Sequence, residues 1–356
     1  MMKHLFGSTL PITHFRSTLL TEPISFTMFM HPVCLHKFLL IVKASLPIFI
    51  SVITKKQFGI SLINFCKMNN RDHFVIVNGK SVLRENAAIP AMHSGLFYGA
   101  GCFETMRAER GKIFRLRYHV ERLNRGLAYL GVPEDLFIHA DELNEEITTL
   151  LNKNLLNNEI AKVRVQISLN ENMGYGIDEN LSLLNIINSS KYSDDTTPIQ
   201  LTITDVRTVP YESRPCDLKL SNMLHYRAAY REALEKGFND SLMLNIQNFV
   251  AETSVANIFW LKDNTVYTPS KRTDILPGIM REEIIALIRN QSSYNLKIGE
   301  FTLDEVKHAE LVWISNSLKE IVVVEQIDEV SYAPEHELIP LLRQQLQHQK
   351  EAENYE

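Results

Sequence analysis

The sequence predicts an α+β protein with two domains, and three features of the chain support that prediction. The first half joins short apolar strand-like segments by tight turns, which favours an antiparallel sheet, and it also contains two amphipathic helical segments. A polar, turn-rich stretch at residues 189–198 follows, and strands and helices alternate again after it. A length of 356 residues is sufficient for two domains of ordinary size.

The periodicity of apolar residues gives the order of the elements. In the first half it predicts strands at 73–78, 112–116, 161–168 and 181–187, a loop entering a strand at 96–107, and helices at 118–130 and 143–156. In the second half it predicts strands at 200–206, 241–245, 257–262, 265–267, 311–315 and 321–324, and helices at 222–236, at 279–289 and after Pro334. The domains are therefore expected at 68–190 and 199–356, with a linker at 191–198.

Residues 1–67 differ in composition from the rest of the chain. Glu22 is the only acidic residue before Asp72, and Lys43 and Pro47 interrupt the apolar stretch 38–53. That stretch is shorter than the roughly 20 residues that a membrane helix needs. We interpret this leader as an artefactual extension, with a cleaved targeting segment as the alternative. The folded part is then expected to begin near Met68.

Composition limits the possible classes of function. The formal net charge of −5 argues against a general nucleic-acid binder. The cysteines are scattered and have no metal-ligand or disulfide-framework spacing; they are Cys34, Cys66, Cys102 and Cys216. We therefore expect no metal site, no membrane association of the folded part, and a cytoplasmic protein.

Two ionisable residues stand in apolar surroundings. Lys219 lies between Leu218 and Leu220, where partial desolvation would lower its pKa and make its amine a better nucleophile. Taken alone, an exposed lysine on an edge strand is the commoner interpretation. Glu252 interrupts an apolar stretch, so it needs a partner if it is buried. The alternative is a turn residue between two strands.

Two further features suit the binding of an anion. Pro277 and Gly278 precede a predicted helix, whose first backbone N–H groups have no partner within the helix. Most such motifs are ordinary helix starts. Arg122, in the predicted helix at 118–130, could bind a phosphate or could be a solvated surface charge.

A series of short motifs connects these residues. In chain order they read VNGK, GLFYGAGCFETMR, IFRLRYHVERL, KVRVQIS, LKLSN, AETSVANIFW, YTPS, ILPGIMR and WISNSLKEIVVV. This series resembles the class IV aminotransferases, the fold-type IV pyridoxal 5′-phosphate (PLP) enzymes, over about residues 73–330. The family includes branched-chain and D-amino-acid aminotransferases and aminodeoxychorismate lyase. The resemblance implies a homodimer of two-domain α+β chains, with the cofactor in the interdomain cleft.

The resemblance also implies a role for each matching residue. Lys219 resembles the Schiff-base lysine, and Glu252 the acid that pairs with the pyridinium nitrogen. Four residues resemble the phosphate site: Arg122, Gly278, Ile279 and Met280. Four others lie where the family binds the phosphate or the substrate, namely Asn316, Ser317, Tyr98 and Arg164.

The subfamily remains open on the sequence. Asn222 stands near the position where branched-chain enzymes carry a tyrosine, and AETSVAN replaces their EGSGEN; both features are closer to the lyases. However, ENMGYG lacks the arginine of the GGRGY segment found in many lyases. We expect transamination between a small amino acid, branched-chain-like or D-configured, and a 2-oxo acid. The close alternative is aminodeoxychorismate lyase, which forms 4-aminobenzoate; a non-catalytic PLP-binding protein is the alternative of another class.

The composition of the leader leads to a first prediction. A chain that starts at Met68 should fold and be as active as the full chain, because the motif series begins after that residue. Solubility and activity of the two purified proteins, compared side by side, provide the measurement. Insoluble protein from the shorter chain would mean that residues 1–67 complete the core.

Overall fold

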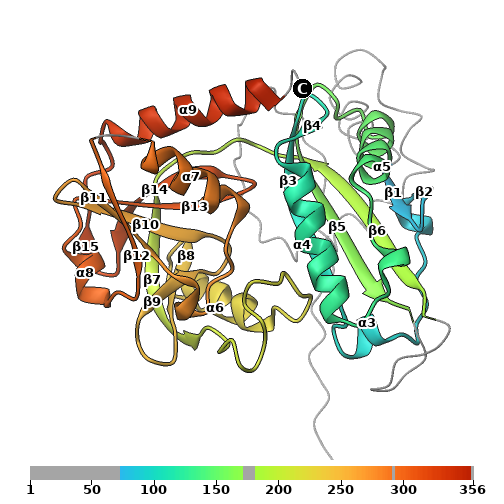
Figure 1. Ribbon diagram of the computed structural model, residues 1–356, viewed down its shortest axis with the longest axis horizontal. Coiled ribbons are helices and arrows are strands. Elements are labelled where there is room, and N and C mark those ends of the chain that lie inside the picture. The colour runs from blue at the N-terminus through green and yellow to red at the C-terminus, as the bar shows by residue number, and fades with distance from the viewer. Residues whose placement is uncertain (1–72, 171–180, 291–292, 354–356) are drawn as a thin grey trace, which may run out of the picture. The chain divides into compact units, whose positions relative to one another are not determined.

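The computed structural model describes residues 73–170, 181–290 and 293–353, which belong to one compact unit spanning residues 72–356. This unit contains two β-sheets with helices packed on them (Figure 1). Among the described residues, no helix is long and apolar enough to cross a membrane.

The first sheet has six strands in the order β2-β1-β6-β5-β3-β4, and every pairing within it is antiparallel, as predicted. Its strands are β1 Phe74–Val77, β2 Lys80–Leu83, β3 Gly101–Glu109, β4 Lys112–Ile113, β5 Ile160–Leu169 and β6 Leu183–Lys191. The left-handed conformations of Asn78 and Gly79 close the β1–β2 hairpin. At Gly101–Phe103 the edge of β3 away from β5 is not covered by β4, which pairs only with Ala108 and Glu109.

Helices α4 (Leu116–Tyr129) and α5 (Ala140–Lys153) cover one face of this sheet (Figure 1). Each buries an apolar stripe at helical spacing, which in α4 includes Val120, Leu123 and Leu127. These side chains join those of the sheet in one hydrophobic core. A short helix, α3 (Ser94–Phe97), precedes β3 and was not predicted.

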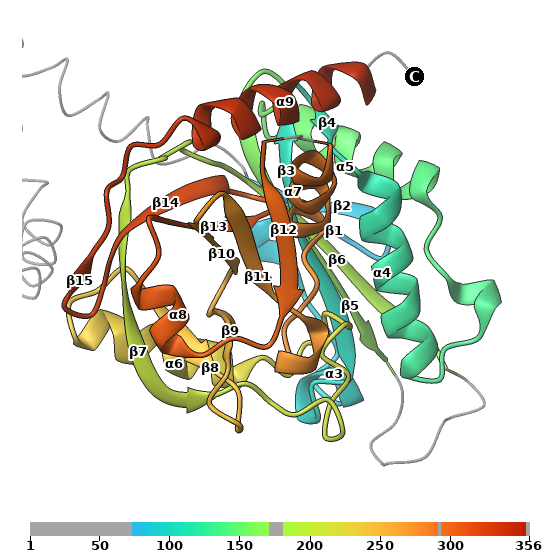
Figure 2. The ribbon, with the colours of Figure 1, turned by 60° about the vertical axis from the view of Figure 1, so that its left-hand side comes forward.

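The second sheet has nine strands, eight of them in the order β12-β11-β10-β13-β14-β7-β8-β9, with β15 added to β14. Their bounds are β7 Ile199–Arg207, β8 Asp240–Leu244, β9 Val250–Thr253, β10 Asn257–Lys262, β11 Thr265–Pro269, β12 Asn295–Gly299, β13 Leu311–Asn316, β14 Glu320–Ile327 and β15 Val330–Ser331. The sheet is mixed, because β7–β8, β7–β14 and β11–β12 are parallel. It curls so that β9 also lies against β10 and β11 (Figure 2).

Four helices accompany this sheet: α6 Leu224–Glu235, α7 Ile279–Arg289, α8 Leu303–Lys307 and α9 Leu338–Glu353. The inside of the curl holds Trp260, which stacks on Tyr267 and meets the ring of Phe301 edge-on. On the other side, α7 and α9 pack together against Phe259 and Trp313. The two faces of the sheet thus support separate apolar clusters.

Several elements differ from those predicted. β6 extends to Lys191, so the predicted linker partly belongs to a strand. The strand predicted at 112–116 ends at Ile113, because Arg115 takes a left-handed conformation and precedes the first residue of α4. β9 and β12 were not predicted at all. The division into domains at 190 and 199 stays a prediction.

Candidate active site

Lys219 is held at the boundary between the two sheets by main-chain hydrogen bonds. Its carbonyl accepts from the N–H of Phe103 at 3.0 Å, and the N–H of Ser221 donates to the carbonyl of Gly101 at 2.8 Å. Leu220 therefore pairs with Cys102 as an isolated antiparallel bridge on the uncovered edge of β3. The neighbouring Leu218 and Leu220 are buried in the core of the first sheet. The apolar neighbours of the lysine thus anchor its backbone.

The amine of Lys219 points over an aromatic ring rather than toward a carboxylate. Its Nζ lies 4.9 Å from the centre of the Phe103 ring, and among the described residues it has no hydrogen-bond or ion-pair partner. Burial, reinforced by the positive charge of Arg122, lowers the pKa of the Lys219 amine to about 8. Because the side chain is partly buried and its amine lies over the Phe103 ring, the interpretation as an exposed edge-strand lysine is wrong.

Glu252 is a buried strand residue in β9, not the turn residue of the alternative interpretation. Its carboxylate accepts hydrogen bonds from the hydroxyl of Tyr226, from Asn257 Nδ2 at 3.0 Å and from the N–H of Leu276 at 2.9 Å. Burial raises the pKa of Glu252 to about 7, against the opposing effect of the Tyr226 hydrogen bond. A nearby cation would therefore decide whether this acid is ionised at neutral pH.

Arg122 is buried in a charge cluster that the sequence did not reveal. Its Nε and Nη2 donate to the two oxygens of Glu104 at 2.6 and 2.9 Å, and Glu104 also lies 2.8 Å from His119 Nδ1. All three side chains are at most 4% exposed. Burial opposes ionisation of Glu104, but the charges of Arg122 and His119 outweigh it and hold the pKa of Glu104 well below its usual range. The interpretation of Arg122 as a solvated surface charge is therefore wrong.

The start of α7 is hydrogen-bonded to Arg122 directly and to Glu252 through Asn257. Arg122 Nη1 donates to the carbonyl of Pro277 at 3.1 Å. The N–H of Gly278, the residue that caps α7, donates to Asn257 Oδ1 at 3.1 Å, and a Cβ at Gly278 would lie 2.3 Å from that oxygen. A side chain there would displace Asn257 from its hydrogen bonds. Because Asn257 occupies the Gly278 amide and the first helical hydrogen bond runs from the N–H of Glu282 to Gly278, the N–H groups of Ile279 and Met280 have no partner in the helix and are available to an anion.

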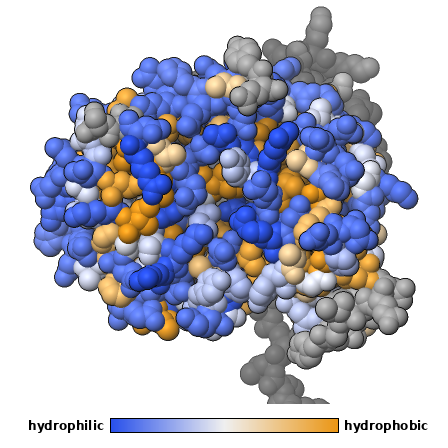
Figure 3. Space-filling model, in the orientation of Figure 1, coloured by the Kyte–Doolittle hydropathy of each residue, from blue (hydrophilic) through white to orange (hydrophobic). Residues whose placement is uncertain are grey.

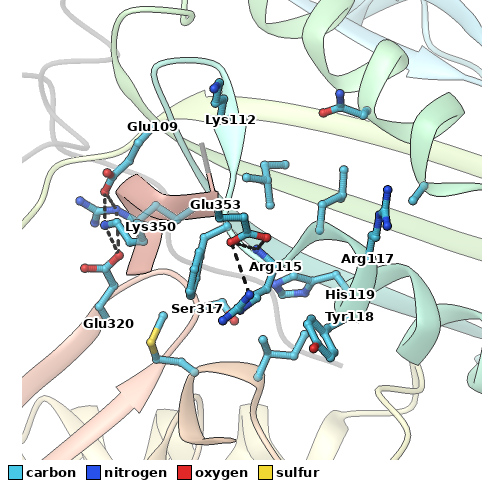
Figure 4. A pocket seen from close by; sticks show the side chains of 18 of the residues that line it. Glu109, Lys112, Arg115, Arg117, Tyr118, His119, Ser317, Glu320, Lys350 and Glu353 are labelled. Carbon is cyan, nitrogen blue, oxygen red and sulfur yellow. Dashed lines mark hydrogen bonds and ion pairs between the residues drawn. The ribbon is translucent and has the colours of Figure 1, made fainter. Parts of the chain in front are cut away.

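Ser317 meets the start of α7 in a cavity of about 710 Å³ that opens beside α4 and α9. Ser317, His119, Ile279 and Met280 all contribute to its lining, and Figure 4 shows Ser317 and His119 within it. Lys219 and Glu252 do not line this cavity. The cavity therefore reaches the predicted phosphate cradle and not the predicted reactive lysine.

The side chain of Asn316 is engaged with the backbone. Asn316 Oδ1 accepts from the N–H groups of Leu318 and Lys319 at 2.9 and 2.7 Å, and its Nδ2 donates to the carbonyl of Val255 at 3.1 Å. It thereby shapes the β13–β14 turn that carries Ser317. Its direct role toward a ligand stays a prediction.

Arg164 shares an aromatic neighbour with Lys219, whereas Tyr98 lies at the end of α3. The guanidinium carbon of Arg164, in β5, is 4.0 Å from the centre of the same Phe103 ring that Lys219 covers. Tyr98 ends α3 and is 45% exposed. The adjacent Gly99 packs close to Asn222, three residues after Lys219. The Phe103 ring thus lies between the predicted substrate residue Arg164 and the predicted reactive Lys219.

The predicted residues therefore form one region at the junction of the two sheets, and it also contains Phe103, Glu104, His119, Tyr226 and Asn257, which the sequence did not single out. Glu104 and His119 do stand within the motifs GLFYGAGCFETMR and IFRLRYHVERL. Glu104 pairs with His119 and Arg122, which lie 15 and 18 positions further along the chain, a pairing that no local spacing reveals.

Known proteins share the motifs and the fold that form this region. The family described as "Amino-transferase class IV" matches residues 101–327. The chain belongs to the class IV aminotransferases. Among curated relatives, it is 31% identical over 264 residues to an aminodeoxychorismate lyase of Bacillus subtilis, covering 72% of this chain and 88% of that protein. It is 27% identical over 270 residues to a D-alanine aminotransferase of Listeria monocytogenes, covering 73% and 89%.

The fold agrees with this family. The branched-chain amino-acid aminotransferase of Escherichia coli superposes with a TM-score of 0.71 at 23% identity, over 77% of this chain and 93% of that chain. The chain is therefore an enzyme of the fold-type IV class, whose cofactor is PLP. The observed residues fit that cofactor: an unpaired amine of low pKa, a buried carboxylate, and a glycine-capped helix start with free N–H groups.

The environment of Lys219 leads to a pH prediction. Only the neutral amine can attack the PLP aldehyde, so the second-order rate of PLP attachment to apo-protein should rise about tenfold per pH unit up to about pH 8 and level off above it. The growth of the visible absorbance band, which borohydride should abolish, measures this rate between pH 7 and pH 10. A rise that continues to pH 10 would show an ordinary, solvated lysine.

Proposed function

We propose that this protein is a PLP-dependent lyase that releases pyruvate from aminodeoxychorismate and forms 4-aminobenzoate, with Lys219 as its proton-transfer residue. The observation that carries the catalytic part of the proposal is the amine of Lys219, which is half-buried, unpaired among the described residues and lowered in pKa to about 8. Such an amine is neutral in a substantial fraction near neutral pH, as both a nucleophile and a base must be.

When bound, PLP supplies an aldehyde that takes up the substrate amine and an electron-poor ring that accepts an electron pair. Lys219 would take a proton at Nζ from the ring carbon that bears the amino group, while the C–O bond from the neighbouring ring carbon to the enolpyruvyl group breaks. Lys219 would then return the proton to the departing enolpyruvate, which becomes pyruvate, and the ring is left aromatic as 4-aminobenzoate. The ring of Phe103 keeps water from one side of this amine. Because burial and the Arg122 charge disfavour the ammonium form, Lys219 gives up the proton readily.

Glu252 is proposed as the partner of the pyridine nitrogen. Its pKa of about 7 means that a cationic nitrogen beside it would stabilise the carboxylate. The hydrogen bonds from Asn257 and Leu276 orient the carboxylate, and Asn257 connects it to the capping residue of α7. The proposed phosphate ligands, the N–H groups of Ile279 and Met280 together with Ser317 and Arg122, surround the same helix start.

The choice of the lyase reaction rests on sequence kinship. The 31% identity to the Bacillus subtilis aminodeoxychorismate lyase extends over 88% of that protein. Asn222 and the AETSVAN segment also point in that direction. Asn222 lies three residues after Lys219, and the AETSVAN segment contains Glu252.

Transamination is the second candidate, and the position of Arg164 favours it. Its guanidinium stacks on Phe103, and Gln166 at 3.3 Å is its hydrogen-bonding partner, so it can receive the carboxylate of an amino acid held at Lys219. The donor would be a branched-chain-like or D-amino acid and the acceptor a 2-oxo acid.

We also propose that the enzyme works as a cytoplasmic homodimer. Several apolar side chains next to the site are exposed in the single chain, including Leu96, Phe97 and Tyr98 of the α3 region. Apolar residues also form patches among the hydrophilic ones on the face shown in Figure 3. Contact with a second copy would bury such surface.

The proposed reaction predicts the outcome of parallel assays. Purified enzyme should release pyruvate and fluorescent 4-aminobenzoate from aminodeoxychorismate, and it should act on leucine or D-alanine with 2-oxoglutarate much more slowly. Lys219→Ala should abolish every one of these activities while some PLP remains bound. Faster turnover of leucine or D-alanine would establish transamination instead, and no turnover of any of the three would remove the catalytic proposal.

The phosphate role of Arg122 predicts a binding defect. Arg122→Ala should weaken PLP binding roughly 10- to 100-fold, since a charge-assisted contact contributes about 1.5–3 kcal/mol. The same change leaves Glu104 buried without its main partner, which costs on the order of 3–5 kcal/mol of folding stability. Titration of apo-protein with PLP should therefore be repeated on Glu104→Gln/Arg122→Ala, where that unpaired charge is absent.

Arg125, exposed on the same helix, provides the control for this prediction. Arg125→Ala should bind PLP like the parent protein. If the double variant at Glu104 and Arg122 also binds PLP normally, the guanidinium serves only the buried ion pair and its phosphate role must be dropped.

A further inference from the structure

The turn between β13 and β14, which carries Ser317, contains a residue in an unfavourable conformation. Glu320 has a φ of 61°, a left-handed value that a non-glycine residue adopts only under strain. Asn316 fixes the start of the turn through the N–H groups of Leu318 and Lys319. The end of the turn must therefore be held by contacts outside it.

Those contacts come from two buried cations. Lys350 Nζ, in the last part of α9, donates to Glu320 Oε1 at 2.7 Å and to Glu109 Oε1 at 3.1 Å (Figure 4). Arg107, in β3, donates from Nη1 to the carbonyl of Leu318 at 3.2 Å and lies 3.8 Å from Glu320 Oε1. Lys350 is 9% exposed and Arg107 is 8% exposed, so water screens these charges weakly.

The carboxylates around this turn outnumber the cations that bind them, so the loss of one cation matters. Arg107 also binds Asp194 through two hydrogen bonds of 2.9 and 2.7 Å, which completes a set of two cations and three carboxylates. Burial opposes ionisation of Glu109, but Lys350 and Arg107 outweigh it and lower the pKa of Glu109. Without Lys350, Arg107 alone would face Glu109, Asp194 and Glu320, and mutual repulsion would push Glu320 out of place.

Lys350 connects this turn to the opposite end of the chain. The buried residues of α9 pack it onto α7, and they are Leu338, Ile339, Leu342 and Leu346. The helix then extends past the second sheet, so that Lys350 reaches Glu109 in the first sheet. Ser317, Ile279 and Lys350 all line the same cavity. Helix α9 thus packs on α7, which begins with Ile279, and is bonded through Lys350 to the turn that carries Ser317.

We propose that Lys350 is a positioning residue for the anion cradle: by anchoring Glu320, it places Ser317 opposite the N–H groups of Ile279 and Met280. The inference deepens the proposed function, because it takes this cradle as the place of the PLP phosphate. It assigns to the C-terminal helix α9 a part in cofactor retention that acts through the phosphate and not through Lys219. Loss of Lys350 should affect ligands that carry a phosphate and spare those that lack one.

The test compares PLP with pyridoxal, which has the same ring and aldehyde without the phosphate. Apo-protein is titrated with each ligand and the visible absorbance band is followed. Lys350→Met should weaken PLP binding roughly tenfold, the effect of one hydrogen bond to a charged group, and leave pyridoxal binding unchanged. Lys350→Arg should restore most of the PLP affinity. Glu351→Gln, at the next and exposed position of α9, is the matched control and should change neither ligand.

A second arm asks whether Lys350 acts through Glu320. Glu320→Gln should reproduce the selective loss for PLP, and the double variant Glu320→Gln/Lys350→Met should lose no more than the larger single effect. Additive losses would overturn the inference. So would tighter PLP binding in Glu320→Gln, because a lysine freed from Glu320 would then be touching the phosphate itself.

The thermal midpoint of each apo-protein shows whether the variants are folded, and if Lys350→Met is not, Lys350→Arg and Glu320→Gln decide the question alone. Equal loss for PLP and pyridoxal would indicate general destabilisation and overturn the inference. If the parent protein prefers PLP to pyridoxal and Lys350→Met keeps that preference, this inference fails while the proposed function stands. If the parent takes up no PLP, both fail.

Discussion

The site depends on a short piece of main-chain pairing between the two halves of the chain. Residues 219–221 hydrogen-bond to the edge of β3 that β4 leaves uncovered, and Leu218 and Leu220 are buried in the core of the first sheet. This pairing fixes the backbone of Lys219, while its amine extends over Phe103. A lysine supplied by the second half of the chain is thus held by the first, so its position requires both sheets to be folded and in contact.

Two buried carboxylates in the rest of the region, Glu104 and Glu252, have different kinds of hydrogen-bonding partner. Glu104 is satisfied by Arg122 and His119, and this ionic cluster leaves Lys219 beside a positive guanidinium, which helps to keep its amine neutral. Glu252 has neutral donors instead and a raised pKa. The two acids therefore differ in their proton affinity because one neighbour is a cation and the other a hydroxyl. Such a difference allows one acid to serve structure and the other to respond to a ligand.

Much of the fold could be predicted from the pattern of apolar residues, since α4, α5 and most strands lie where periodicity indicated. The failures have local physical causes. α3 spans only four residues, too few to show a helical period. The predicted strand at 112–116 was shortened by the left-handed Arg115, and β12 is a largely exposed strand of five residues in which only Leu296 and Ile298 are apolar, too short a pattern to stand out. The roles of Lys219 and Glu252 were expected from family resemblance; taken alone, each residue had an ordinary explanation.

By itself, the sequence determined the family, the α+β class and the residue types available for chemistry, because these depend on local patterns and on the order of motifs. The tertiary structure alone decided which of those residues meet. Glu104 pairs with Arg122, Tyr226 with Glu252, and Lys350 with Glu320 across 30 positions of chain. The reason is that burial converts weak, screened charges into strong interactions, and burial is a property of packing that no stretch of sequence specifies on its own.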